Sequence, residues 1–245
     1  MKTLLKKWLR VDANEDGRQQ WLVQTLGAIP PGLRVLDAGA GELRNRPLCS
    51  HLNYVSQDAC QYEGKGDSNG LQTGEWDTSQ IDLVSDILNI PEPDASFDAI
   101  LCSEVFEHLP DAVKALDEFE RLLKPGGILI TTAPFASLVH FAPYHYATGF
   151  SRYWYEYHLP VKNFSIRELR ANGDWFAMTK QEVLRLPRMA RQYGDWCWPF
   201  TYLVAGIGLL YFSIRGNTRS AEDVSCFGWH CVAVKQQNLS APPAN

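Results

Sequence analysis

Apolar and polar positions alternate along residues 17–135 in the order expected of an α/β fold. Short apolar runs, bounded by glycine, proline or acidic residues, alternate with segments of helical spacing. This pattern predicts parallel strands joined by crossover helices. The predicted strands are 33–39, 53–58, 81–87, 97–105 and 128–135, and the predicted helices are 18–29, a segment just after Gly41, and 111–123.

The regular pattern weakens after Phe135. Residues 137–159 combine many aromatic side chains with three histidines and have no clear period, which predicts an irregular segment over the edge of the sheet. Ser165 can cap a helix over 165–173, and residues 174–184 predict a strand that continues into a helix. Alternating apolar residues at 224–235 predict a last strand.

We therefore expect one domain over residues 1–235. Its expected parts are a ligand-binding core at 17–135, a lid and C-terminal part at 136–235, and a disordered tail at 236–245.

Residues 197–214 form a run of 18 residues without a charged side chain. This length is the lower limit for crossing a membrane, but Pro199, Gly206 and Gly208 favour a buried or interface helix. We expect such a helix to make either peripheral membrane contact or contact with another copy of the chain.

The charge and the cysteines narrow the class of protein. The formal net charge of −5 gives no basic field of the kind that binds nucleic acid, so we expect no nucleic-acid partner. The six cysteines show no CxxC pairing, and the first ten residues hold no apolar stretch of signal-peptide length, only a pattern that allows a short amphipathic turn. These features predict a cytoplasmic protein, with peripheral attachment to the inner face of the membrane as the alternative.

The stretch "DAGAG" ends the first predicted strand with a glycine loop. Gly39 and Gly41 allow a tight turn and close approach of a ligand, but the third glycine of a dinucleotide-binding loop is missing. The Asp37 carboxylate would repel a pyrophosphate and attract a cationic ligand that carries an ammonium and a sulfonium group. S-adenosylmethionine is such a ligand. Asp58, about 20 residues further on, can then accept the ribose hydroxyls, and Asp86 with Ile87 can bind the adenine.

Several segments together resemble one known family. "VLDAGAG", Asp58, "SDILNIPEPDASFDAILCSEVFEHLPD" and "LKPGGILITTAPF" are similar to class I S-adenosylmethionine-dependent methyltransferases of the type 11-like group. The resemblance covers residues 17–135 and implies a Rossmann-like sheet of seven mostly parallel strands with helices on both faces and an antiparallel last strand. It departs from the family in the insertion 64–79 and in "ELRNRP" at 42–47. The cofactor-binding residues implied are Asp37, Gly39, Ala40, Gly41, Asp58, Asp86, Ile87, Ser103 and Glu104.

The candidates for catalysis follow the fourth and fifth predicted strands. Glu104, Glu107 and His108 share one face if a helix starts there. A structural or cofactor-lining role ranks first, a general base second, and a divalent metal third, so we expect no metal. His145 is the preferred base, with His108 and Glu107 as further catalytic candidates. The expected acceptor contacts are His140, Tyr144, Arg152 and Tyr153.

These features predict O-methylation of a hydroxyl group on a small molecule or glycan. Similarity to enzymes of bacterial surface polysaccharides favours a sugar as the acceptor. The alternative within enzymes is a quinone or phenol O-methyltransferase that uses a divalent metal at the membrane surface. The alternative of another class is a scaffold protein that binds S-adenosylmethionine without catalysis, and an NAD-dependent oxidoreductase is disfavoured by Asp37 and the missing glycine.

Overall fold

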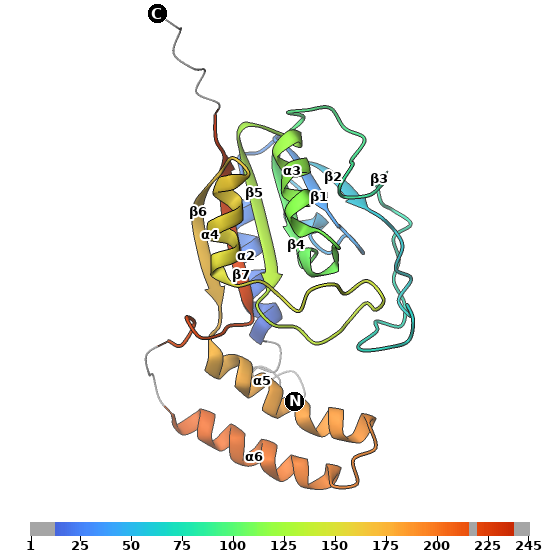
Figure 1. Ribbon diagram of the computed structural model, residues 1–245, viewed down its shortest axis with the longest axis vertical. Helices are drawn as coiled ribbons and strands as arrows, with labels where there is room; N and C mark the ends of the chain where they lie inside the picture. The colour runs from blue at the N-terminus through green and yellow to red at the C-terminus, as the bar shows by residue number, and fades with distance from the viewer. Residues whose placement is uncertain (1–12, 216–219, 238–245) are drawn as a thin grey trace, which may run out of the picture. The chain divides into compact units, whose positions relative to one another are not determined.

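A mixed β-sheet of seven strands in the order β3-β2-β1-β4-β5-β7-β6 is the scaffold of the protein (Figure 1). The computed structural model describes residues 13–215 and 220–237. The strands are β1 (Arg34–Ala38), β2 (Asn53–Asp58), β3 (Leu83–Val84), β4 (Phe97–Ser103), β5 (Leu123–Pro134), β6 (Phe164–Asn172) and β7 (Gly228–Lys235). The helices are α2 (Ala13–Gly27), α3 (Ala112–Leu122), α4 (Arg152–Val161), α5 (Trp175–Gln192) and α6 (Trp198–Ile214), with short 3₁₀ helices at Arg46–Cys49 and Phe106–His108.

The strand directions confirm the predicted fold class. β1 pairs in parallel with β2 on one side and with β4 on the other, and β4 pairs in parallel with β5. β7 runs antiparallel to β5, with Val232 opposite Ile130. The strand order reverses between β1 and β4, and in open α/β sheets ligands bind outside the carboxyl ends of the strands at this switch point.

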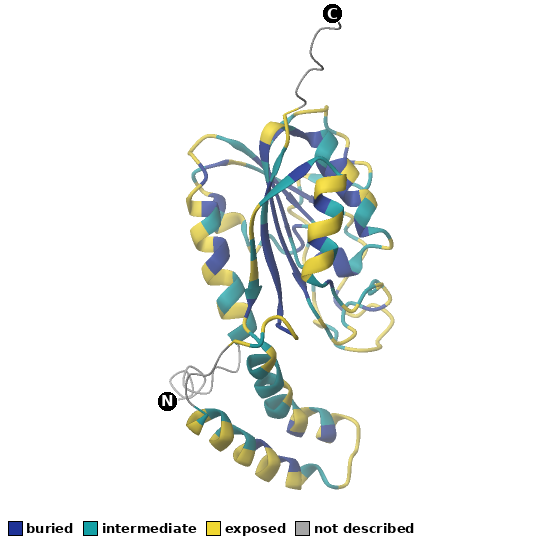
Figure 2. Cartoon of the chain, turned by 60° about the vertical axis from the view of Figure 1, so that its left-hand side comes forward, coloured by how far each residue is buried: buried dark blue, intermediate teal, exposed yellow. Residues whose placement is uncertain are grey.

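Helices cover the two faces of the sheet, as the sequence predicted. On one face, Trp21 and Leu26 of α2 pack against Val35, Ala99 and Ile130 of the central strands. Successive residues of a strand point to opposite faces of the sheet. The buried residues Leu36 and Ile100, which follow Val35 and Ala99, therefore face the side that α3 covers in Figure 1. Figure 2 shows the central strands as a buried layer between helices whose outer sides are exposed.

The chain divides into two compact units. One holds residues 20–170 and 228–245, which include β1 to β5, β7, α3 and α4. The other holds residues 1–19 and 171–227, which include α5 and α6. In this second unit α5 packs against α6, and Gly208 leaves room for the side chain of Val183.

Four local predictions were wrong. Residues 152–161 form α4, and the segment after Gly41 turns into the 3₁₀ helix Arg46–Cys49 without an α-helix. Residues 164–172 form β6, and the whole of 175–192 is helical, so neither the helix at 165–173 nor the strand at 174–184 is present. Pairing within the sheet selected the strand, since "FSIRELRAN" carries a mixture of β-formers and helix-formers that permits both states.

The apolar segment 197–214 forms α6, but the helix is not buried. Within α6 only Thr201 and Ala205 are buried. A continuous stripe of exposed apolar side chains runs along the helix at spacings of three and four residues: Phe200, Leu203, Val204, Ile207, Leu210, Tyr211 and Ile214. Among the described residues, no helix combines the length and apolar character needed to span a bilayer. The predicted amphipathic turn at the N-terminus and residues 238–245 of the predicted tail lie outside the described residues.

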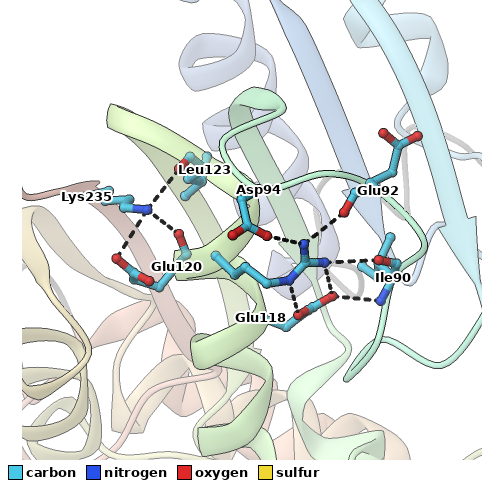
Figure 3. A network of polar contacts seen from close by, with 8 residues as sticks. Ile90, Glu92, Asp94, Glu118, Glu120, Leu123 and Lys235 are labelled. Carbon is cyan, nitrogen blue, oxygen red and sulfur yellow. Dashed lines mark hydrogen bonds and ion pairs between the residues drawn. The ribbon is translucent and has the colours of Figure 1, made fainter.

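A network of charges around the buried carboxylate of Glu118 joins α3 to the loop before β4 (Figure 3). The Arg121 guanidinium donates to both carboxylate oxygens of Glu118, at 2.7 and 2.9 Å, and to the backbone carbonyls of Ile90 and Glu92. Glu118 in turn accepts a hydrogen bond of 2.7 Å from the backbone amide of Ile90. The buried carboxylate of Glu118 is therefore stable only while Arg121 balances its charge.

We expect Arg121→Met to lower the free energy of unfolding by about 2–3 kcal/mol, since it leaves Glu118 buried without its cation. Urea denaturation of the variant and the unmodified protein measures the change. Lys114→Met is the matched control, because Lys114 and Asp111 form an exposed pair at 3.6 Å whose loss costs roughly 0.5 kcal/mol or less. Equal effects of the two substitutions would contradict the role of Arg121 in balancing the charge of the buried Glu118.

Candidate functional site

The glycine loop after β1 is the centre of the site. Gly39 and Gly41 adopt φ angles of +75° and +51°, which side chains rarely permit. The amides of Gly39 and Ala40 both donate to the backbone carbonyl of Gln57, at 2.8 and 2.9 Å. A Cβ on Gly39 would lie 2.5 Å from a methyl group of Val105, so the loop also needs glycine for space. The predicted turn is present and lies at the carboxyl end of β1.

Asp58 fixes this loop to the end of the neighbouring strand. One carboxylate oxygen accepts a hydrogen bond of 2.9 Å from the amide of Gly41, and the other accepts one of 2.8 Å from the amide of Cys60. A carboxylate offers about four acceptor positions, so two remain for a ligand. Asp58 therefore both shapes the loop and keeps acceptors for hydroxyl donors.

Asp37 lies beneath the loop and is buried. The Tyr54 hydroxyl donates to it at 2.7 Å. Burial raises the pKa of the Asp37 carboxyl to about 6, although hydrogen bonds from Tyr54 and Asn45 oppose this shift. Burial also raises the pKa of the Tyr54 phenol. Asp37 is thus a buried carboxyl group, held by Tyr54 of β2, two residues before Gly39.

The ends of β3 and β4 complete the predicted cofactor residues. Asp86 accepts from the amide of Leu88 in an exposed turn, and Ile87 is buried beside it. At the end of β4, the Thr132 hydroxyl lies 2.8 Å from that of Ser103 and donates to Glu104 at 2.9 Å. Glu104 has a φ of +57°, an unfavourable conformation for a residue with a side chain that often marks a functional position.

An aromatic cluster, Tyr62, Trp76 and Phe141, lies over the glycine loop, and the sequence did not predict it. The Trp76 ring is so close to Gly41 that a Cβ there would lie 2.6 Å from it. Trp76 contacts Phe141 with ring centroids 5.0 Å apart, and Tyr62 stacks on Phe141 at 4.5 Å. The only signal in the sequence was two large aromatic residues inside an otherwise polar stretch, 61–80.

Two irregular segments form one cover because their backbones bond to each other. The amide of Leu71 in the insertion donates to the carbonyl of Val139, and the amide of Phe141 donates back to the carbonyl of Leu71. The amide of Asp67 donates to the carbonyl of Ala142 at 3.1 Å. The insertion 64–79, which appeared only as a departure from the family pattern, therefore lies outside the predicted lid at 136–235 but forms the cover together with it.

Three histidines and one glutamate gather beside this cover. The ligating atoms of His108, His140 and His145 all lie within 4.8 Å of one another. Oε1 of the buried Glu107 lies 3.7 Å from Nε2 of His108 and 3.8 Å from Nε2 of His140. The His108 ring stacks on Phe141 at 5.1 Å, which joins the group to the aromatic cluster. The structure thus brings together the three catalytic candidates and one of the acceptor-binding candidates.

Burial keeps the imidazoles of His108 and His145 neutral. Burial, followed by the neighbouring His140, lowers the pKa of His108 to about 4. Burial and His140 also lower the pKa of His145. Rings of this kind offer lone pairs at neutral pH without a positive charge.

The side chains of the other predicted residues are not part of this group. Glu104 does not share a helical face with Glu107 and His108, because residues 106–108 form only one 3₁₀ turn and Glu104 bonds to Thr132. Tyr144 contributes its carbonyl, which accepts from Nδ1 of His108. Arg152 pairs with Glu156 at 2.6 Å on α4, and the Tyr153 side chain is exposed.

Residues 36–131 match the family model described as "Methyltransferase domain". A ubiquinone biosynthesis O-methyltransferase of Xylella fastidiosa (strain 9a5c) is 35% identical over 105 residues, which cover 41% of this chain and 42% of that protein. The sterol 24-C-methyltransferase ERG6B of Gibberella zeae is 30% identical over 114 residues, which cover 45% of this chain and 30% of that protein. The chain therefore spans less than half of the length of these curated relatives.

Solved structures show the same fold at low identity. The [4+2]-cyclase SpnF has a TM-score of 0.55 at 16% identity, over 90% of this chain and 80% of that one. A Haloferax volcanii protein solved with the methyltransferase activator Trm112 has the same TM-score and identity, over 96% and 97% of the two chains. Since one of these proteins is a cyclase, the fold alone does not fix the reaction.

Asp37→Asn should change how stability depends on pH. The carboxyl has a pKa of about 6 when folded, against 3.8 as the ordinary value, so the folded chain retains a proton that the unfolded chain releases. Stability contributed by this group is therefore lost as the pH rises from 4 to 6. We expect the variant to gain up to about 3 kcal/mol over the unmodified protein between pH 4 and pH 7.

Urea denaturation at a series of pH values measures this difference. Asp16→Asn, at an exposed position of α2, is the matched control and should show no such trend. A difference between Asp37→Asn and the unmodified protein that stays constant with pH would refute the assignment of Asp37.

Proposed function

Since the chain carries a class I methyltransferase domain, we propose that it binds S-adenosylmethionine at the carboxyl ends of β1, β2 and β4 and methylates a hydroxyl oxygen. The observation that carries this proposal is the glycine loop, which Asp58 fixes by its hydrogen bond to Gly41 and over which Trp76 lies. When bound, the cofactor supplies a methyl group on a positively charged sulfur.

The residues at this loop fit that ligand. The two unused acceptor positions on Asp58 suit a pair of ribose hydroxyls. Asp86 and Ile87, at the end of β3, offer a carboxylate and a buried apolar surface to an adenine. Glu104 and the buried Asp37 place negative charge near the loop, which favours a cationic ligand and disfavours a pyrophosphate.

The lid residues would exclude water from the transfer step. Methyl transfer from a sulfonium depends mainly on holding the acceptor in line with the breaking bond in a dry site. Tyr62, Trp76 and Phe141 supply flat apolar surface over the loop. The group of His108, His140 and His145 lies beside Phe141, at the margin of this surface.

For the acceptor, we propose an amphiphilic phenol or hydroquinone at a membrane. The relatives named above act, by their names, on ubiquinone precursors and sterols, and another matching protein is a 2-methyl-6-phytyl-1,4-hydroquinone methyltransferase of Synechocystis. These acceptors share a hydroxylated ring system and a long apolar part. These names favour a quinone-type acceptor over the sugar acceptor that the sequence suggested. The sugar acceptor stays a prediction.

The second unit supports attachment to an anionic bilayer. The exposed stripe of α6 presents seven apolar side chains along one side of the helix. Residues 175–215 carry five basic and two acidic side chains, in a chain whose overall charge is −5. A helix with an apolar face and basic neighbours binds in the interface of anionic membranes. The predicted cytoplasmic location, at the inner face of the membrane, is consistent with this arrangement.

The cofactor is tested by calorimetric titration with S-adenosylhomocysteine. We expect micromolar binding, and a loss of roughly ten- to a hundredfold in Asp58→Asn, because hydrogen bonds to a charged acceptor contribute about 1.5–3 kcal/mol each. Asp111→Asn is the matched control, since asparagine caps α3 as well as aspartate does. No binding of S-adenosylhomocysteine, or tighter binding of NADH, would overturn the proposal.

The acceptor is tested by transfer of a radiolabelled methyl group from S-adenosylmethionine to two catechols, one with a long prenyl tail in phosphatidylglycerol-containing vesicles and one without a tail in solution. We expect Ile207→Glu with Leu210→Glu to lower turnover of the tailed catechol at least about tenfold, because two side chains no longer enter the bilayer. Turnover of the soluble catechol should be unchanged.

Val161→Glu is the control, as Val161 is equally exposed but lies on α4. Methylation of a sugar and of neither catechol would overturn the phenolic acceptor. Cofactor binding without turnover of any acceptor would favour the scaffold alternative. Light scattering that shows an oligomer which the double variant dissociates would assign the stripe to a second copy of the chain.

A further inference from the structure

The geometry of Glu107, His108, His140 and His145 points to a site for a divalent transition-metal ion of the zinc class, and we propose that this ion joins the lid to the end of β4. His108 and Glu107 follow β4, whereas His140 and His145 belong to the segment after β5. The sequence had suggested another set of metal ligands, Glu104 with Glu107 and His108, and no metal was expected there. In the structure Glu104 bonds to Thr132 and is not part of the histidine cluster.

The ring orientations prepare two histidines for a metal. Nδ1 of His108 contacts the carbonyl of Tyr144, and Nδ1 of His140 contacts that of Leu138 at 2.8 Å. A carbonyl only accepts, so in the neutral rings each Nδ1 carries the proton and each Nε2 carries a lone pair. Metal-binding histidines are held in this way, by a hydrogen bond from the other ring nitrogen to a backbone carbonyl.

The lone pairs point into one small region. Nε2 of His108 and both ring nitrogens of His145 are buried and have no hydrogen-bond partner among the described residues. A buried polar atom without a partner costs about 1–3 kcal/mol, so unpaired ring nitrogens on two histidines of one cluster indicate a ligand between them. Oε1 of Glu107 lies within 3.8 Å of Nε2 of His108 and of Nε2 of His140, so its negative charge is next to these nitrogens.

The donor set selects the type of ion. Three imidazoles and one carboxylate match the ligands of zinc, whereas magnesium and calcium prefer oxygen ligands alone. Zinc–nitrogen bonds of about 2.0–2.1 Å would bring the ring nitrogens to about 3.3 Å from one another. The present separations, of up to 4.8 Å, require movements on the order of 1 Å in side chains of an irregular segment.

Such an ion would hold the cover closed over the glycine loop. The amides of Tyr146 and Ala147 already donate to the carbonyl of Glu107, so the lid segment lies against this residue without a metal. Coordination would add a cross-link between two segments that are 32 residues apart, from His108 to His140. The metal site is argued from these side chains alone and does not rest on the identity of the acceptor.

The test is binding of ZnCl₂ and CoCl₂ to untagged full-length protein freed of metal by chelator. We expect one equivalent of zinc by calorimetry and the visible absorption of tetrahedral cobalt with nitrogen and oxygen ligands. His140→Ala and His145→Ala should each weaken zinc binding at least about a hundredfold. His158→Gln, a histidine of α4 outside the cluster, should bind as the unmodified protein does, and MgCl₂ should not displace cobalt.

Titration with S-adenosylhomocysteine keeps the two proposals distinguishable. Binding of S-adenosylhomocysteine by the histidine variants would show that they are folded. If the unmodified protein binds zinc but not S-adenosylhomocysteine, the proposed function is overturned and the metal site is not. No zinc binding by the unmodified protein, equal binding by the two alanine variants, or a thiolate absorption band from cobalt bound to a cysteine would overturn the metal site.

Discussion

The two hydrogen bonds that Asp58 accepts are the constraint on which the candidate site depends. They hold the amides of Gly41 and Cys60 at the end of β2 and so fix the shape of the loop that leaves β1. Two bonds from Gly39 and Ala40 to the carbonyl of Gln57 extend the same junction. The parallel pairing of β1 with β2 makes this junction possible, because it brings Ala38 beside Gln57 at the carboxyl ends of the two strands.

The cover of the site depends on that junction in turn. Gly41 leaves room for the Trp76 ring, and the ring contacts Phe141 of the segment after β5. Both covering segments lack regular structure, and several backbone hydrogen bonds join one segment to the other, as between Leu71 and Val139. Each segment thus satisfies polar groups that the other would otherwise leave unpaired. The lid and the loop therefore form one structural unit at the switch point of the sheet.

The helical unit differs from the sheet in the surface that it presents. The central strands bury their apolar residues between helices, whereas α6 exposes a stripe of them. A long apolar helix is usually buried in the hydrophobic core. An apolar helix that stays exposed therefore indicates a surface for contact with a membrane or a protein. The basic side chains of the same unit support the proposed contact with an anionic membrane.

By itself the sequence determined the α/β class, the parallel strands of the first 135 residues, the glycine loop and the acidic residues at the strand ends. These features follow from local periodicity and from turn chemistry, which neighbouring residues fix. Only the tertiary structure decided that residues 164–172 form a strand, that Trp76 lies over Gly41, and that His140 and His145 meet Glu107 and His108. Irregular segments carry no period, and their positions depend on contacts between residues far apart in the chain, which no local pattern records.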